Sequence, residues 1–343
     1  MKNDILNIFN HNNGKTFVIA EIGANHNRSL SLAKEMIDVA AEAGADAAKF
    51  QIYSAPTLYS AQQDPQMHYD GRELNSLIES VETPRNWLPE LSAYCRKKNI
   101  LFFATPFDMA AVDELDDVSE LFKIASFEIV DLPLIRHTAS KGKPMIISTG
   151  LANMGEIEDA YMACLSQKNG QVVFLQCASC YPASASIMNL RSMATMKRAF
   201  GTPVGLSDHT LGIHISVAAV AMGASVIEKH CTMDRKMKGP DHPFAIEPDE
   251  LKEMVRQIRE VEAAQGDGFK RGPQSDEMKL YGMARRSIHA AVDIAAGTRI
   301  TEQMLIAKRP GYGLRPKYID WVVGRKASRD ITQDMWITLE MLD

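Results

Sequence analysis

The chain of 343 residues lacks the features that mark secreted, membrane and nucleic-acid-binding proteins. It has only five cysteines, an odd number and too few for a disulfide scaffold, which is typical of a reducing compartment. No apolar run is long enough to span a bilayer, and the first residues do not resemble a signal peptide. The formal net charge is −5, so nucleic acid and membrane surfaces are not expected partners. We therefore expect a cytoplasmic protein.

One cysteine pair has the spacing of some zinc and redox sites. Cys177 and Cys180 form a C-x-x-C, but no second pair of this kind follows. Cys177 also ends an apolar run, so we interpret it as a buried thiol at a strand end and Cys180 as a loop thiol. We therefore reject a redox role for this pair.

Short apolar runs recur along the chain, with amphipathic segments between them. Mostly apolar rather than alternating runs are typical of strands that are buried on both faces. Alternating strands and helices predict a parallel sheet, and eight such units predict a closed (β/α)8 barrel. The rival, an open doubly wound sheet, would need an early Gly-x-Gly-x-x-Gly turn, which is missing. The predicted strands are residues 17–21, 46–51, 100–105, 121–126, 144–149, 172–177, 203–207 and 225–230.

The composition changes after Gly266. A helical segment that begins at Pro248 ends there and completes the eighth unit, so residues 1–266 are predicted to form the barrel. Residues 267–283 begin with a polar stretch containing Gly and Pro, and they are interpreted as a linker. Residues 284–343 show short strands and turns, and they predict a small C-terminal domain with little core of its own. Within the barrel, the connection from Gln51 to Pro84 is long, and such loops usually carry function.

Polar side chains follow every predicted strand at its end. In a barrel of this kind the active site lies at the carboxyl ends of the strands. Turns are commonly polar, but lysines and a glutamate inside buried runs need partners of opposite charge. We therefore predict that these side chains converge on one site. They include Glu21, Asn25, Lys49, Gln51, Thr105, Lys123, Ser126, Ser148, Ser179, Tyr181, Ser207, His209, Glu228 and His230.

Two histidines follow the seventh and eighth predicted strands, which are neighbours in a closed barrel. A single histidine at such a place is more often a structural residue. As a pair, His209 and His230 suit a divalent transition metal that keeps positions open for substrate.

A second group of side chains could hold an anion. Lys123 supplies charge, and the hydroxyls of Ser126, Ser148 and Ser207 supply geometry for a phosphate or carboxylate. Glu21 is a candidate acid or base.

Long motifs occur in order along the chain: EIGANHNRSLSLAKEMIDVAAEAGADAAKFQ, ATPFD, FKIASFEI, GLSDHTLG, EKH and GPDH. From about residue 17 to the C-terminus the sequence resembles the sialic acid synthases. The segment RRSIHAAVDIAAGTRITEQMLIAKRPGYG resembles their antifreeze-like (SAF) domain. These enzymes condense phosphoenolpyruvate with an N-acetylhexosamine aldehyde, such as N-acetylmannosamine or a 2,4-diacetamido analogue. A C–C bond forms, a C–O bond is cleaved and phosphate is released.

The resemblance implies roles for individual residues. His209 and His230 would bind a divalent metal, with Mn²⁺ first and Mg²⁺ or Co²⁺ as alternatives. Glu21, His209 and Lys123 would be catalytic. Arg309 would reach the sugar site of the partner subunit in a domain-swapped homodimer. The expected substrate-binding residues are Lys49, Gln51, Thr105, Ser126, Ser148, Ser179, Tyr181, Ser207, Asp241 and Arg309.

Two positions depart from the family pattern. Arg28 stands where a glycine is common, and it either alters sugar preference or is a solvated residue at a helix start. Cys231 replaces an aromatic residue and should change packing more than chemistry.

Two alternatives remain open. The first is a synthase that uses phosphoenolpyruvate and a phosphorylated aldose, against which the C-terminal domain argues. The second is a non-catalytic carbohydrate-binding protein, against which the intact set of Glu21, Lys123, His209 and His230 argues.

Overall fold

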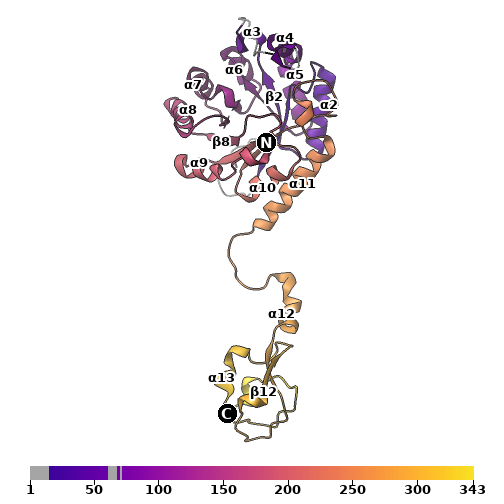
Figure 1. Ribbon diagram of the computed structural model, residues 1–343, viewed down its shortest axis with the longest axis vertical. Helices are drawn as coiled ribbons and strands as arrows, with labels where there is room; N and C mark the ends of the chain where they lie inside the picture. Colours follow the sequence, from indigo (N-terminus) through magenta and orange to yellow (C-terminus); the bar gives the residue numbers. More distant parts are fainter. Residues whose placement is uncertain (1–14, 61–67, 70–71) are drawn as a thin grey trace. The chain divides into compact units, whose positions relative to one another are not determined.

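Eight parallel strands close into a barrel in the first of two compact units (Figure 1). The computed structural model describes residues 15–60, 68–69 and 72–343, and the units are Met1–Gly266 and Asp267–Asp343. Around the barrel the order is β1-β10-β9-β8-β7-β6-β5-β2, so first and last strands are neighbours. The predicted barrel and its eight strands are confirmed. The strands are β1 (Phe17–Gly23), β2 (Ala47–Ile52), β5 (Leu101–Pro106), β6 (Phe122–Ile124), β7 (Met145–Ser148), β8 (Val172–Cys177), β9 (Val204–Asp208) and β10 (Val226–His230).

Helices surround the strands, as Figure 1 shows. Their ends follow local sequence signals: Asn153 and Glu156 form a capping box before α8, and Gly201 ends α9 in a left-handed conformation. Helix α11 begins at Pro248, as predicted, and ends just before Gly266. The helices are α2 (Leu30–Glu42), α5 (Leu88–Lys97), α6 (Met109–Asp116), α7 (Leu132–Ser140), α8 (Met154–Ser166), α9 (Ser192–Phe200), α10 (His214–Ala221) and α11 (Pro248–Gln265).

Side chains alternate between the barrel interior and the helix layer along each strand. On β1, Phe17 and Ile19 belong to the interior cluster, whereas Val18 and Ala20 pack in the layer beneath the helices. The interior apolar cluster occupies the half of the barrel where the strands begin. It consists of Phe17, Ile19, Ala47, Leu101, Phe103, Leu121, Ile146, Val173, Leu175 and Val226. Glu21 follows Ile19 by two residues, so the same alternation places it on the interior face, near the end of β1.

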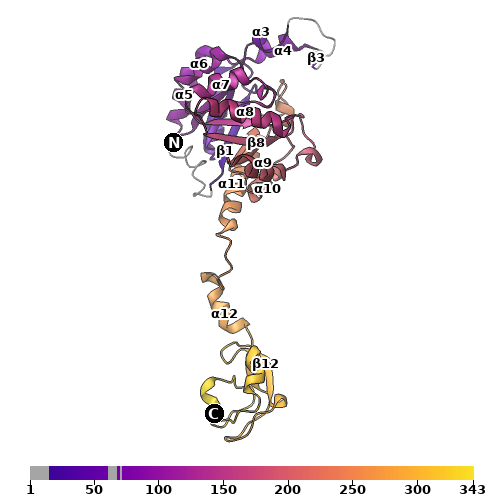
Figure 2. The ribbon, with the colours of Figure 1, turned by 90° about the vertical axis from the view of Figure 1, so that its left-hand side faces the viewer.

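The connection between β2 and α5 extends beyond the ring of helices (Figure 2). The loop after β1 forms hydrogen bonds with it: His26 Nε2 lies 2.8 Å from Thr83 Oγ1, and Arg28 Nη1 donates to the Glu79 carbonyl at 2.9 Å. Arg28 has a φ of 56°, in the left-handed region that favours glycine. The connection contains α3 (Ala55–Leu58), β3 (His68–Tyr69), β4 (Arg72–Glu73) and α4 (Leu74–Val81).

The second unit has a small apolar core that includes Ile288, Ile300 and Ile337. Its strands β11 (Ser287–Ala290) and β12 (Leu305–Lys308) pair antiparallel, and α13 spans Ile319–Val322. Part of the predicted linker is helical, because a capping box between Gln274 and Glu277 starts a turn that continues into α12 (Met278–Ala284).

None of the helices in residues 15–60, 68–69 and 72–343 is both long and apolar enough to cross a lipid bilayer.

Candidate active site

Four buried charged side chains meet inside the barrel near the strand ends. Lys49 Nζ lies 2.8 Å from Glu21 Oε2 and 3.6 Å from Glu228 Oε2, and Lys123 Nζ lies 3.7 Å from Glu228 Oε1. Each residue is at most 4% exposed. Two cations and two anions therefore compensate one another in a place that would not tolerate an isolated charge.

The two carboxylates differ in their tendency to hold a proton. Burial raises the pKa of Glu21, and the charge of Glu228 raises it further, which outweighs the opposing effect of Lys49. For Glu228, burial also acts to raise the pKa, but Lys123 and Lys49 outweigh it and the net pKa is lowered. Two carboxyl groups whose pKa values are pushed apart can take different roles in proton transfer. Glu21, which also accepts a 2.7 Å hydrogen bond from Gln51 Nε2, is the better proton carrier.

Hydroxyls and an amide next to Lys123 form a cradle for an anion. Lys123 Nζ donates to Ser148 Oγ at 2.7 Å, and the Gly150 amide donates to Ser126 Oγ at 3.1 Å. Ser179 Oγ is buried and has no hydrogen-bond partner among the described residues. A Cβ at Gly150 would lie only 2.3 Å from that oxygen, so only glycine leaves this space open. Several donors that face one small space suit a phosphate group.

Two other predicted hydroxyls contact the charged centre. Lys49 Nζ donates to Thr105 Oγ1 at 3.1 Å, and Ser207 Oγ donates to Glu228 Oε1 at 3.0 Å. Ser207 was expected near Lys123, and both residues approach the same carboxylate oxygen of Glu228. The hydrogen bond from Ser207 helps to lower the pKa of Glu228.

The two predicted histidines are neighbours. The ring centroids of His209 and His230 are 5.4 Å apart. His209 Nδ1 lies 3.0 Å from the Ala178 carbonyl, which assigns the N–H to Nδ1 and leaves Nε2 as the free lone pair. His230 Nδ1 is buried without a hydrogen-bond partner, with Asp241 Oδ2 at 3.5 Å.

These features fit a bound metal ion. Burial lowers the pKa of His230 well below its usual range, and the charge of Lys49 lowers it further, so the imidazole is neutral and able to ligate. The described residues contain no group of three or more His, Cys, Asp or Glu side chains that could hold a metal. A metal on the two imidazoles would therefore take its other ligands from water or substrate.

An aromatic wall lies beside the histidines at the mouth of the barrel. The ring centroids of Tyr181 and His209 are 4.4 Å apart, and those of Phe244 and His230 are 5.1 Å apart. Tyr181 is 45% exposed, so one edge faces solvent. Burial raises the pKa of Asp241, nearby, to about 6.

The barrel brings together all of the predicted site residues except Arg309, which is exposed in the second unit. Glu228 was expected among the converging side chains without a role of its own, and the structure makes it an anionic partner of both Lys49 and Lys123. Two further residues border the site that the sequence did not select for it: Gly150 and Phe244. Gly150 belongs to the motif STG, which is among those that resemble the family, whereas nothing local in the sequence distinguishes Phe244.

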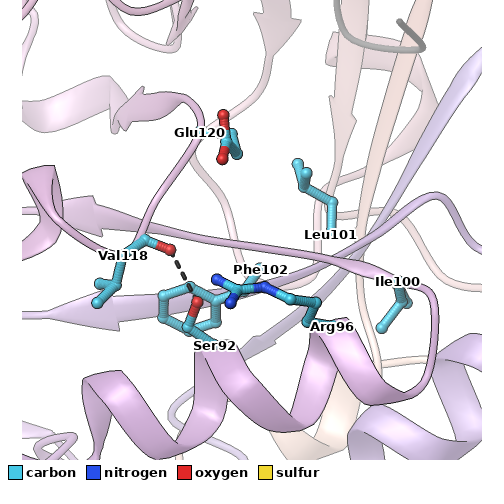
Figure 3. Close-up of a pocket in the computed structure, with 7 residues that line it drawn as sticks. All are labelled: Ser92, Arg96, Ile100, Leu101, Phe102, Val118 and Glu120. Atoms are coloured by element: carbon cyan, nitrogen blue, oxygen red, sulfur yellow. Dashed lines mark hydrogen bonds between the residues drawn. The ribbon is translucent and has the colours of Figure 1, made fainter. Parts of the chain in front are cut away.

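A separate pocket lies near the opposite end of the barrel, where the strands begin (Figure 3). It is lined by Ser92 and Arg96 of α5 and by Leu101, the first residue of β5, and Ser92 Oγ donates to the Val118 carbonyl at 2.9 Å. Residues at this end of a parallel barrel serve stability rather than catalysis, so we do not include the pocket in the site.

Fold and site together define a (β/α)8-barrel enzyme. Residues 36–270 match the NeuB family and residues 285–343 match the SAF domain. The N,N'-diacetyllegionaminic acid synthase of Campylobacter jejuni is 41% identical over 93% of this chain and 98% of its own. The human N-acetylneuraminate-9-phosphate synthase is 37% identical over 95% of this chain and 92% of its own length. A crystal structure of the N-acetylneuraminic acid synthetase of Leptospira borgpetersenii with citrate is also similar, with a TM-score of 0.69 and 37% identity. The match covers 78% of this chain and 90% of that chain. The chain belongs to the NeuB family, which confirms the resemblance seen in its motifs.

Proposed function

We propose that the protein is a nonulosonic acid synthase that condenses phosphoenolpyruvate with an N-acetylhexosamine aldehyde and releases phosphate. The observation that carries this proposal is the position of the anion cradle around Lys123 within the same barrel mouth as the His209–His230 pair. One group of residues suits a phosphorylated substrate, and the other suits the activation of a carbonyl. The names of the relatives support the same reaction.

A divalent metal, with Mn²⁺ first and Mg²⁺ or Co²⁺ as alternatives, would be held by His209 and His230. When bound, such an ion acts as a Lewis acid that polarises the aldehyde of the sugar. The neighbouring Asp241 and the Tyr181 ring would position the sugar beside it.

The other steps fall to residues of the charged centre and the cradle. Carbon 3 of phosphoenolpyruvate attacks the aldehyde carbon, positive charge develops at carbon 2, and water adds there. Glu21 accepts a proton of that water, since it is the carboxylate with the raised pKa, and one proton goes to the former aldehyde oxygen, which becomes a hydroxyl of the product. Lys123 and the hydroxyls of Ser126 and Ser148 hold the phosphate while the C–O bond breaks. One water is consumed, and one phosphate is released for each nonulosonic acid formed.

The proposal is tested by phosphate release from phosphoenolpyruvate in the presence of Mn²⁺. N-acetylmannosamine, a 2,4-diacetamido hexose and a phosphorylated aldose are supplied separately, and the sugar acid product is identified by mass spectrometry. We expect release with one of the N-acetylated sugars. Release with the phosphorylated aldose alone would support the rival synthase, and sugar binding without release under any condition would support a carbohydrate-binding protein.

The working assembly would be a homodimer in which the SAF domain of one subunit serves the barrel of the other. Support comes from the small apolar core of the second unit and from the exposed position of Arg309. The five free thiols are consistent with work in the cytoplasm.

A further inference from the structure

A buried ion pair lies on the side of the barrel wall that faces the helices. Val204 and Leu206 of β9 pack in the helix-facing layer, and so does Ile227 of β10. By the alternation of side chains, Asp208 and Lys229 follow on this same face of their strands. Their side chains are 0% and 1% exposed, and Lys229 Nζ lies 3.0 Å from Asp208 Oδ2.

The pair is part of a network that connects two strand ends and a helix. Asp208 Oδ1 accepts from the Thr210 amide at 2.9 Å and from the Thr210 hydroxyl at 2.8 Å. Asp208 Oδ2 accepts from Ser216 Oγ of α10 at 2.6 Å. Lys229 Nζ donates to the Thr210 carbonyl at 2.6 Å. The Asp208 carboxylate therefore has four donors, and the ammonium of Lys229 bridges the two strands.

The network encloses the backbone of both candidate metal ligands. Asp208 precedes His209 and binds Thr210, which follows it, so the peptide units on both sides of His209 are fixed. Lys229 precedes His230 and binds the same Thr210. Asp208 and Lys229 are also register partners in the pairing of β9 with β10. The one ion pair thus holds the spacing of two imidazoles that point to the opposite side of the wall.

Stability alone gives little reason for this arrangement. A buried ion pair loses hydration energy that its attraction barely restores, and apolar residues of similar size are often as stable or more so. What a charged pair adds is a fixed geometry, and residues behind metal-binding histidines commonly act in this way.

We infer that Asp208 and Lys229 are positioning residues that preorganise His209 and His230 for a divalent metal. This inference rests on the proposed metal site, and neither residue touches substrate or metal.

The test measures Mn²⁺ affinity of the full-length protein, without substrates, from the electron paramagnetic resonance signal of free Mn²⁺. Asp208→Asn keeps the shape of the side chain but removes its charge, and it is expected to weaken Mn²⁺ binding by about 10- to 100-fold. Ser216→Ala removes one hydrogen bond to the carboxylate without leaving a buried charge unpaired, and it should weaken binding by about 2- to 5-fold with little change in melting temperature. Ser216→Ala also serves as the readout if Asp208→Asn does not fold.

Two further variants separate positioning from stability. Asp46→Asn removes a carboxylate at the other end of the barrel, where Asp46 Oδ2 lies 2.9 Å from both Arg259 Nη2 and the Val18 amide. This control should lower the melting temperature and leave the Mn²⁺ affinity unchanged. The double variant Asp208→Asn/Lys229→Met has no unpaired buried charge, so its melting temperature should recover relative to Asp208→Asn while its Mn²⁺ affinity stays weak.

Two results would overturn the inference while the metal site stands. The first is an unchanged Mn²⁺ affinity in Asp208→Asn, or in Ser216→Ala if Asp208→Asn does not fold. The second is a double variant that recovers its Mn²⁺ affinity together with its stability. If the wild-type protein binds no Mn²⁺, Mg²⁺ or Co²⁺, the proposed metal site itself is wrong, and the positioning role is wrong with it.

Discussion

Glu21 and Lys49 are register partners on the adjacent strands β1 and β2, and their charged atoms lie 2.8 Å apart inside the barrel. Glu228 Oε2 also lies 3.6 Å from Lys49 Nζ, so the lysine keeps an anionic partner if Glu21 is neutralised. The contact therefore allows the role of Glu21 in proton transfer to be examined without loss of the fold.

Glu21→Gln should lower kcat by about 10²- to 10⁴-fold, because an amide cannot accept the proton of the attacking water. Affinity for phosphoenolpyruvate, measured by calorimetry, should change little, since Lys123 and the cradle are intact. Glu114→Gln on the surface of α6 is the control and should keep full activity. A Glu21→Gln enzyme with near-normal kcat would remove Glu21 from the mechanism.

Lys123→Ala should raise the KM for phosphoenolpyruvate by about tenfold or more, since it removes a charge-assisted contact with the phosphate. The KM for the sugar should stay within about twofold. Steady-state rates of phosphate release give both values, and circular dichroism checks the fold, because Glu228 loses one of its two cations. Equal increases in both KM values would argue that Lys123 supports the site as a whole.

His209→Ala should abolish the stimulation of phosphate release by Mn²⁺ and should lower the bound metal measured after dialysis. One imidazole without the other leaves too few protein ligands to retain the ion. His289→Ala, at a buried histidine of the second unit, tests whether any histidine substitution has this effect. Full metal content in the His209→Ala protein would refute the assignment.

His26 should make stability depend on pH. Burial lowers its pKa to about 4, and Nδ1 accepts a hydrogen bond from the Arg28 amide, so the folded protein holds the neutral form. The unfolded chain binds a proton near pH 6.5, and the stabilising contribution present above that pH is lost as the pH falls toward 4. Between pH 7 and pH 5 the loss is about 2 kcal/mol.

Urea unfolding at these two pH values measures the effect. In His26→Gln the difference in unfolding free energy between pH 7 and pH 5 should shrink by that amount, and the exposed His214→Gln should leave it unchanged. The same pH dependence in wild type and His26→Gln would show that other groups cause it.

The sequence was most informative about the strands, because short apolar runs recur along the chain. Eight buried runs predicted the strands, and the polar residues at their carboxyl ends predicted that Lys49, Lys123 and His230 converge on one site. The sequence could not predict which hydrogen-bond partner each side chain has in the folded protein. The hydrogen bond from Ser207 to Glu228 is of this kind, because the two residues meet only through the register in which β9 pairs with β10.

Backbone conformation is another property that is hard to predict from a single sequence. Arg28 was open to interpretation as a residue that selects the sugar or as a solvated residue. The structure shows a left-handed residue whose guanidinium binds the carbonyl of Glu79 in the β2–α5 connection. This contact favours a role in holding that connection, and nothing about the residue type alone indicates it.

Arg309 provides the test of exchange between subunits. Arg309→Ala should raise the KM for the sugar by about tenfold or more, through the loss of a charged hydrogen-bond donor, and leave affinity for phosphoenolpyruvate unchanged. An Arg309→Ala subunit mixed with a Lys123→Ala subunit forms heterodimers in which, if the domains are exchanged, one of the two sites has both wild-type residues. Random association should then restore about a quarter of the wild-type sites. If each SAF domain serves its own barrel, every site keeps one lesion and mixing restores nothing. Light scattering on both variants, alone and mixed, verifies that the dimer persists, and a fully active monomer would refute the exchange.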